Sequence, residues 1–265
     1  MGRVGGRLRG RAWVARRPVT AEPLVVRTDR SDGLTTLMLN RPEKLNALTP
    51  SVFVELRAHL GAIAADSAVG CVVLAGAGRA FCAGHDLEAI ANHDPAPSRH
   101  FEPETVDALE NLPQPTIARI HGHCYTGGLE LALACDLLVA SESAKLGDTH
   151  GQWGLVPIWG MSVRLPERVG RSTAKELMFT SRRIDGRTAE AIGLVDRCVA
   201  DNALDASVDA LATEVLANSR GTNRIVKQLV ADRAECTRAD ALVRERQLPH
   251  GLQDDTAERM RSGGR

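Results

Sequence analysis

The strongest constraint on the fold is the way short apolar runs alternate with helical patterns through the first 150 residues. The runs that predict strands are Leu34 to Leu39, Cys71 to Leu74, Thr116 to Ile120, Leu137 to Ala140 and Lys145 to Gly147. After the first run, Thr49 can cap a helix in which Pro50 suits the first position. The apolar face of that helix consists of Val52, Leu56, Leu60 and Ile63. A second helix is expected from about Gly128 to Cys135, so the chain predicts an α/β protein.

The pattern changes after about residue 170, where helices are expected almost alone. The predicted helices are Ser172 to Thr180, Thr188 to Ile192, Leu204 to Ala217 and Arg224 to Ala231, with a polar tail beyond Ala239. Only Leu194 to Val199 interrupts them as a strand. No internal repeat and no long linker divides the chain, which favours one fold with an α/β core over residues 21–200 and a helical region over 201–265.

The charge distribution separates the N-terminus from the rest of the chain. The formal net charge is zero, but residues 1–17 contain six arginines and no acid, which leaves 27 basic against 33 acidic residues elsewhere. A mildly acidic domain does not favour a nucleic-acid partner. The arginine-rich start resembles a mitochondrial transit peptide, yet its glycines disfavour a helix and it contains no serine. We therefore expect residues 1–20 to be a disordered basic extension.

Hydropathy and cysteine usage indicate a protein of the reducing cytoplasm. No apolar run approaches the about 18 residues that a membrane-spanning helix needs, because charges such as Asp136 interrupt every candidate. The six cysteines form no Cys-x-x-Cys pair and there is no secretory leader, so they are expected to be reduced thiols in the core. These features predict no membrane partner and a cytoplasmic location.

Two glycine-containing segments could present free backbone N–H groups to a ligand. One is residues 81–87, which follow a predicted strand, and the other is residues 125–130, in which two glycines precede a helix. Either could be only a tight turn, and Glu130 could be a surface carboxylate near a helix N-terminus. A dinucleotide fingerprint is disfavoured because Phe81 stands where a third small residue is needed after Gly76 and Gly78. Neither a P-loop nor a nucleophile elbow is found.

Several stretches in register resemble the crotonase, or enoyl-CoA hydratase/isomerase, superfamily. They are residues 39–48, 81–87, 121–131 with Cys135-Asp136, 157–170, 179–184 and 191–195. From about Pro23 onward the whole chain is covered. The resemblance implies a spiral of ββα units and C-terminal helices that form a trimer or a dimer of trimers. It also implies an acyl-CoA substrate whose enolate is stabilised, with coenzyme A as part of the substrate and no other cofactor.

The resemblance assigns binding roles to individual positions of this chain. The oxyanion hole would be formed by the backbone N–H groups of His85 and Gly127, in agreement with the two segments identified above. Lys44 and Leu45 would lie near the phosphate and adenine end of coenzyme A, although Lys44 could equally be a solvated loop charge. The remaining positions implied along the adenine and pantetheine path are Ala83, Asp86 and Leu87.

The proton-transfer groups depart from the pattern of the family. Its hydratases use two glutamates, of which the first matches Glu130 and the second falls on His150. Histidine transfers protons near neutral pH, so a pair of Glu130 and His150 can support chemistry. Asp148 could instead supply the second carboxylate, or the site could use Glu130 alone, with His150 a hydrogen-bonded loop residue.

Syn addition of water to a 2-enoyl-CoA is the first expectation for the reaction. The missing second glutamate leaves open double-bond isomerisation, decarboxylation of an acyl-CoA and thioester hydrolysis. A protein that binds CoA thioesters without catalysis and an assembly scaffold are further alternatives.

Two remaining features concern specificity and metals. Trp153 and Trp159 could wall a pocket for a bulky acyl chain, or they could be plain packing. His121 and His123 are expected on one strand face beside Cys124, where the three side chains would form a weak candidate metal site. Because no further paired ligand is evident, no metal is predicted.

Overall fold

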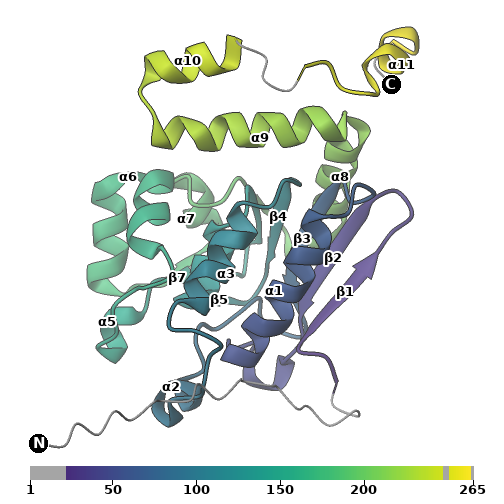
Figure 1. The fold of residues 1–265 in the computed structure, drawn as a ribbon. Helices are drawn as coiled ribbons and strands as arrows, with labels where there is room; N and C mark the ends of the chain where they lie inside the picture. The colour runs from purple at the N-terminus through teal and green to yellow at the C-terminus, as the bar shows by residue number, and fades with distance from the viewer. Residues whose placement is uncertain (1–21, 247–250, 264–265) are drawn as a thin grey trace, which may run out of the picture.

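The computed structural model describes residues 22–246 and 251–263, so the extension predicted at residues 1–20 lies outside the described part. The main sheet has six strands in the order β1-β2-β3-β4-β6-β9 (Figure 1). Their bounds are Val25–Asp29, Leu34–Leu39, Cys71–Gly76, Thr116–Ile120, Leu137–Ser141 and Arg197–Val199. β1 is antiparallel to β2, and the following neighbours are all parallel.

A second, three-stranded sheet lies beside the main one, and the segments after its first two strands reach the pocket described below. It has the order β5-β7-β8, with bounds His123–Tyr125, Lys145–Gly147 and Ile184–Asp185. β5 and β7 are parallel, and the first strand of this sheet begins only three residues after β4 ends. The chain therefore passes from the main sheet to the small one and back again as it advances.

Helices cover both faces of the main sheet. The first five are α1 (Pro50–Ala64), α2 (Leu87–Asn92), α3 (Phe101–Glu110), α4 (Gly127–Leu133) and α5 (His150–Trp153), with a 3₁₀ turn η1 (Pro42–Lys44). Those that follow are α6 (Met161–Thr180), α7 (Gly186–Ala191), η2 (Asp201–Ala203), α8 (Leu204–Ala217), α9 (Arg220–Glu235), α10 (Arg238–Arg246) and α11 (Thr256–Arg261).

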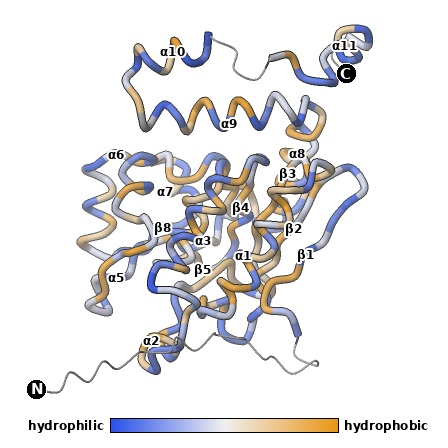
Figure 2. The backbone as a smooth tube through the Cα atoms, viewed as in Figure 1, coloured by the Kyte–Doolittle hydropathy of each residue, from blue (hydrophilic) through white to orange (hydrophobic). Residues whose placement is uncertain are grey.

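The hydrophobic core has one cluster on each face of the main sheet. The larger cluster packs α1, α3 and α4 against the sheet, and Phe53 and Leu56 of α1 are fully buried in it. The smaller cluster packs Leu204, Val208 and Leu211 of α8 against Val73 and its neighbours. Apolar residues accordingly concentrate along the central strands in Figure 2. All six residues of β3 are buried, as expected for a parallel strand covered on both faces.

The C-terminal helices lie against one end of this body (Figure 1). α9 contacts it through long basic side chains: Arg220 donates to the backbone oxygens of Asp32 and Ala68, and Arg224 to those of Asp66 and Val69. α10 packs alongside α9. The predicted helical C-terminal region is therefore present: α8 is held to the sheet by apolar contacts, and α9 is tied to the core by its arginines.

Most predicted elements are found, and two expectations need correction. His121 and His123 do not share a strand face, because Gly122 turns the chain at φ 55° between β4 and β5. The helix expected from Ser172 to Thr180 is found as the second part of α6, after the non-helical Gly170 (φ 77°), whereas the first part, from Met161, was not predicted. The strand near Leu194 is shorter than predicted, since it starts at Arg197. Within the part of the chain that the structure describes, no helix is both long and apolar enough to cross a bilayer.

Candidate active site

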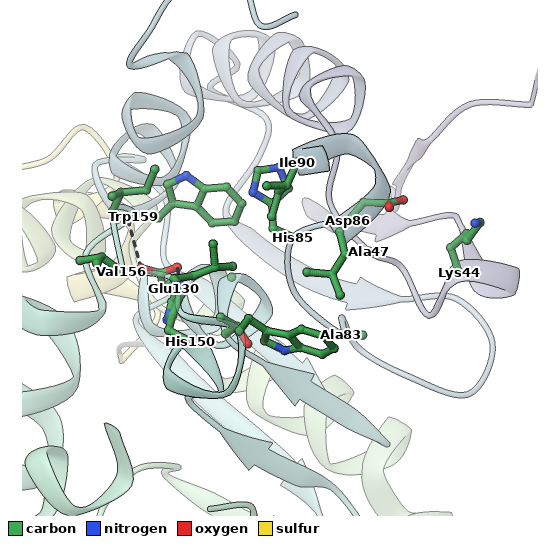
Figure 3. Close-up of a pocket in the computed structure, with 16 residues that line it drawn as sticks. Lys44, Ala47, Ala83, His85, Asp86, Ile90, Glu130, His150, Val156 and Trp159 are labelled. Carbon is green, nitrogen blue, oxygen red and sulfur yellow. Dashed lines mark hydrogen bonds and ion pairs between the residues drawn. The ribbon is translucent and has the colours of Figure 1, made fainter. Parts of the chain in front are cut away.

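A pocket of about 480 Å³ opens between the loop before α1, the start of α2, the start of α4 and the segment from α5 to α6 (Figure 3). The predicted site residues that line it are Lys44, Ala83, His85, Asp86, Leu87, Gly127, Glu130 and His150. Leu45 and Asp148 do not line it. The lining is mostly apolar, with Glu130 and His150 at one end and Lys44 at the other in Figure 3.

Backbone pairing brings the two glycine-containing segments side by side. Cys82 N–H donates to His123 O at 2.9 Å, and Tyr125 N–H donates to Cys82 O at 3.0 Å. The segments approach closely, since a Cβ atom added at Gly84 would lie 3.5 Å from the backbone nitrogen of Gly127. The two segments, distant in sequence, therefore meet at the same wall of the pocket.

Neither predicted oxyanion-hole N–H donates a hydrogen bond to another of the residues that the structure describes. On either side of His85, Gly84 O accepts from Leu48 N–H and Asp86 N–H donates to Leu48 O, both at 2.8 Å. The N–H of His85 points away from that pairing because alternate groups of an extended strand face opposite sides. Gly127 is the first residue of α4, where N–H groups have no partner within the helix.

Close packing explains the two glycines at the start of α4. A Cβ atom on Gly127 would overlap the indole ring of Trp159, and one on Gly128 would overlap the backbone oxygen of Cys82. Thr126 before them has φ 51°, a value that is uncommon for a β-branched residue. The turn is held in this shape by Thr126 N–H, which donates to Gly147 O at 3.0 Å.

Glu130 is a buried carboxyl group fixed by main-chain donors. Its side chain is 1% exposed, and Oε1 accepts hydrogen bonds from the backbone N–H groups of Trp159 and Met161, each at 3.0 Å. Burial raises the pKa of Glu130 to about 7, against the lowering effect of the Met161 N–H and of nearby His150. A carboxyl group with this pKa can both give and accept a proton near neutral pH.

His150 lies across from Glu130 and is paired with Asp148 behind it. The distance from His150 Nε2 to Glu130 Oε2 is 3.9 Å, and Nδ1 lies 2.5 Å from Asp148 Oδ1. Thr149 Oγ1 is 2.7 Å from Thr126 Oγ1, which ties the loop before α5 to the start of α4. The three predicted proton-transfer residues are thus brought together, with Asp148 turned toward His150 and not toward the pocket.

The opposite end of the pocket is more exposed. Asp86 caps α2 by accepting from Glu88 N–H at 3.0 Å, and it pairs with Arg41 at 3.0 Å. Burial is the largest single influence on Asp86 and opposes its ionisation, but the hydrogen bonds from Arg41 and Glu88 N–H and the charge of Arg41 together lower the pKa of the carboxyl group. Lys44 lies 3.3 Å from Glu88, and both side chains are largely in solvent. Leu45 adopts φ 52°, and its backbone oxygen accepts from Ala83 N–H.

Both tryptophans proposed for the acyl wall line the pocket. Trp159 is buried between Phe53 and His85, with ring centroids 4.8 and 4.9 Å away, whereas Trp153 is more than half exposed at the mouth. The His85 ring is neutral at physiological pH, because burial lowers its pKa to about 4. The rings of Trp159 and His85 therefore add no charge to the pocket wall.

The candidate metal site does not assemble. His121 Nε2 is 2.8 Å from Gly78 O, and His123 Nδ1 is 3.0 Å from Tyr125 Oη. Across residues 22–246 and 251–263, no group of three or more histidine, cysteine or acidic side chains is arranged to hold a metal ion.

Sequence reasoning missed several residues of the site. They depend on tertiary contacts between distant segments, which local patterns do not reveal. These contacts are the backbone donors of Trp159 and Met161, the Thr126–Thr149 pair and the ion pair of Asp86 with Arg41. Further unpredicted wall residues are Ala47, Ile90, Leu155, Val156 and Ile158. Pro157 and Gly160, which bracket Trp159, were the one local signal of a tight turn there.

Solved structures share this fold and pocket-forming topology. An enoyl-CoA hydratase from Bacillus anthracis superposes with a TM-score of 0.86 at 32% identity, covering 91% of this chain and 95% of that one. A putative enoyl-CoA hydratase from Thermobifida fusca YX, in complex with CoA, gives a TM-score of 0.78 at 31% identity and covers 85% and 91%. The molecule has the crotonase fold, as predicted.

The sequence comparisons lead to the same class of enzyme. Residues 29–263 match the family described as Enoyl-CoA hydratase/isomerase. A probable peroxisomal enoyl-CoA hydratase 1 of Arabidopsis thaliana is 33% identical over 230 residues, 87% of each chain. This chain belongs to the enoyl-CoA hydratase/isomerase family of acyl-CoA thioester enzymes.

Proposed function

We propose that the protein adds water to a 2-enoyl-CoA, with Glu130 and His150 as its proton-transfer pair. The observation that carries the proposal is the arrangement of this pair, 3.9 Å apart, in the same pocket as the N–H groups of His85 and Gly127, which have no partner among the described residues. A thioester oxygen that accepts a hydrogen bond from each N–H group is stabilised as it becomes negative in the enolate. The free-energy cost is low because the donors are already in place.

Two proton-transfer groups facing each other suit a hydration. Water must lose a proton as its oxygen bonds to the β-carbon, and the α-carbon must gain one. The raised pKa of Glu130 and the imidazole of His150 provide an acid and a base on the same side of the pocket, which fits syn addition. His150 thereby takes the place of the second glutamate expected from the family.

The exposed end of the pocket is the proposed site of coenzyme A. Lys44 and Leu45 would lie near its phosphates and adenine, with Ala83, Asp86 and Leu87 along the path to the thioester. The CoA complex of the Thermobifida fusca relative supports this assignment, and the substrate would bring its own CoA with no additional cofactor. Asp86 acts there through its cap of α2 and its pair with Arg41.

A panel of purified thioesters tests the reaction. Incubation of the protein with 2-enoyl-, 3-enoyl-, malonyl- and saturated acyl-CoAs, followed by mass spectrometry, distinguishes a gain of water from no mass change, loss of carbon dioxide and release of free CoA. We expect a gain of water with 2-enoyl-CoA as the fastest conversion. A faster isomerisation, decarboxylation or hydrolysis would contradict the proposal.

Assembly and location are the remaining parts of the proposal. Phe179 and Val163 on α6 and Val226 and Val230 on α9 are large apolar side chains that are more than half exposed. Such exposure supports a homotrimer or a dimer of trimers. Light scattering coupled to gel filtration tests it, and a monomer at micromolar concentration would contradict it. All six cysteines are free thiols, in keeping with a cytoplasmic location, which imaging of a tagged protein distinguishes from a peroxisomal one.

A further inference from the structure

Asp148 is a buried acid beside the pocket that does not face it. Its side chain is 2% exposed and it is absent from the pocket wall. Its Oδ1 atom lies 2.5 Å from His150 Nδ1 and also accepts from the backbone N–H of His150 at 3.2 Å. The carboxylate is therefore directed at the imidazole that lines the pocket.

This contact determines which ring nitrogen of His150 carries the proton. An ionised carboxylate accepts hydrogen bonds and cannot donate them, so the nitrogen beside it, Nδ1, holds the hydrogen. In the neutral imidazole Nε2 is then an acceptor. Nε2 lies 3.9 Å from Glu130 Oε2, so its lone pair is presented to the proton-transfer end of the pocket.

Other contacts hold the loop without Asp148. Thr126 N–H donates to Gly147 O at 3.0 Å, the hydroxyl groups of Thr126 and Thr149 are 2.7 Å apart, and Gln152 N–H donates to Thr149 O at 3.1 Å. An asparagine at position 148 has nearly the same shape and keeps an oxygen for the His150 N–H. Replacement of Asp148 by asparagine therefore removes a charge and leaves the loop its other anchors.

We propose that Asp148 is a positioning residue that keeps His150 protonated at Nδ1, and so makes His150 the base and Glu130 the acid of the hydration. The inference rests on the proposed function. The water oxygen bonds to the β-carbon while its proton moves to His150 Nε2. The π-electron pair shifts toward the thioester oxygen, which the His85 and Gly127 N–H groups hold. The Glu130 proton then moves to the α-carbon, and the proton on His150 returns to Glu130, so the net change is the addition of one water.

The charges around His150 agree with this division of roles. Among the described residues, the ionisable groups paired with its ring are Asp148 behind it and Glu130 in front of it. His85, Lys44 and Asp86 line other parts of the pocket. Asp148 stabilises the imidazolium that forms when His150 takes the proton. Because burial raises the pKa of Glu130 to about 7, much of this group carries a proton at neutral pH.

The Asp148→Asn substitution, made alone and together with His150→Glu, tests the coupling. In the presence of His150 we expect kcat to fall by about 10- to 100-fold, part of the 10²–10⁴ that acid–base catalysis contributes, with little change in KM. In the His150→Glu enzyme the same substitution should cost at least ten-fold less, since Asp148 there faces a like charge. Equal losses in both backgrounds would indicate a purely structural role and overturn the proposal.

Nitrogen NMR of His150 tests the same proposal without substrate, because it shows which ring nitrogen carries the hydrogen. In the wild-type protein above neutral pH, we expect Nδ1 to carry the hydrogen and Nε2 to be free. A hydrogen on Nε2 would overturn the proposal whether or not the protein hydrates enoyl-CoA, whereas absence of hydration with the expected tautomer would reject the proposed reaction and leave the positioning intact. Asp196→Asn is the matched control, because Asp196 accepts from Leu138 N–H and Arg168 away from the pocket. It should leave kcat and KM unchanged.

Discussion

The two ends of the pocket hold their charged groups in different ways. At the reacting end, Glu130 and His150 are almost excluded from water, and each is fixed by a specific donor or acceptor. At the other end, the Lys44 and Glu88 side chains are 51% and 71% exposed, and they form an ion pair in which Lys44 Nζ lies 3.3 Å from Glu88 Oε2. Water screens the second pair and not the first. Changes at the buried end should therefore alter turnover, and changes at the exposed end should alter binding weakly.

Replacement of Glu130 should give the largest effect. The Glu130→Gln side chain keeps the hydrogen bonds from the Trp159 and Met161 N–H groups but has no proton to transfer. We expect kcat to fall by about 10²–10⁴ while the affinity for a saturated acyl-CoA, measured by calorimetry, changes little. Glu104→Gln on the exposed face of α3 is the matched control. Retained turnover in Glu130→Gln would mean that the buried end does not perform the chemistry.

The Gly127→Ala substitution should be nearly as damaging, although it leaves every ionisable group in place. The new methyl group overlaps the Trp159 ring, so the turn or the indole must move and the N–H loses its alignment. Loss of one such donor costs about 10²–10³ in rate. Gly61→Ala in α1, where nothing lies within 4 Å, controls for the added methyl group. Steady-state kinetics that showed full activity in Gly127→Ala would remove this N–H from the site.

The burial of Glu130 also predicts how stability depends on pH. Its pKa of about 7 in the folded protein exceeds its ordinary value of 4.5, so the folded state holds an extra proton between these values. The wild type should therefore lose stability as pH rises from 4.5 through 7, by up to about 3 kcal/mol relative to Glu130→Gln. Urea unfolding of both proteins at pH 5 and pH 8 measures this difference. Parallel behaviour of the two proteins would contradict the burial argument.

The exposed end should give the smallest effect. Lys44→Ala is expected to raise KM for acyl-CoA about two- to five-fold at low salt, with kcat unchanged and the difference reduced at high salt. Glu88→Gln should do the opposite, because it frees Lys44 for a phosphate. Lys175→Ala, on the exposed face of α6, is the control. A large loss of kcat in Lys44→Ala would erase the distinction between the two ends.

Local patterns were sufficient for the elements with regular apolar spacing. The bounds predicted for Leu34–Leu39, Thr116–Ile120 and Leu204–Ala217 are those observed, because burial on one or both faces sets the spacing directly. The α3 helix at Phe101–Glu110 escaped prediction because only Thr105, Val106 and Leu109 of it are buried. The break at Gly122 escaped because a glycine within an apolar run can equally continue a strand.

The site was predicted as a set of residues and not as an arrangement. Spacing within the family pattern singled out His150 and Asp148, but no local rule could tell which of them faces the pocket. That depends on how the loop between β7 and α5 is tied to Thr126, a contact across 23 positions of sequence. The main-chain donors to Glu130 were unpredictable for the same reason, since they arrive from 29 and 31 residues away.

One further consequence follows from those main-chain donors. Because the peptide groups of residues 159 and 161, and not their side chains, bind the Glu130 carboxyl, the indole at 159 can be exchanged for another group while both bonds persist. The room available for an acyl tail and the orientation of the Glu130 carboxyl group are thus separable traits. Redesign of this wall toward longer or branched chains would start from a proton donor that is already in place.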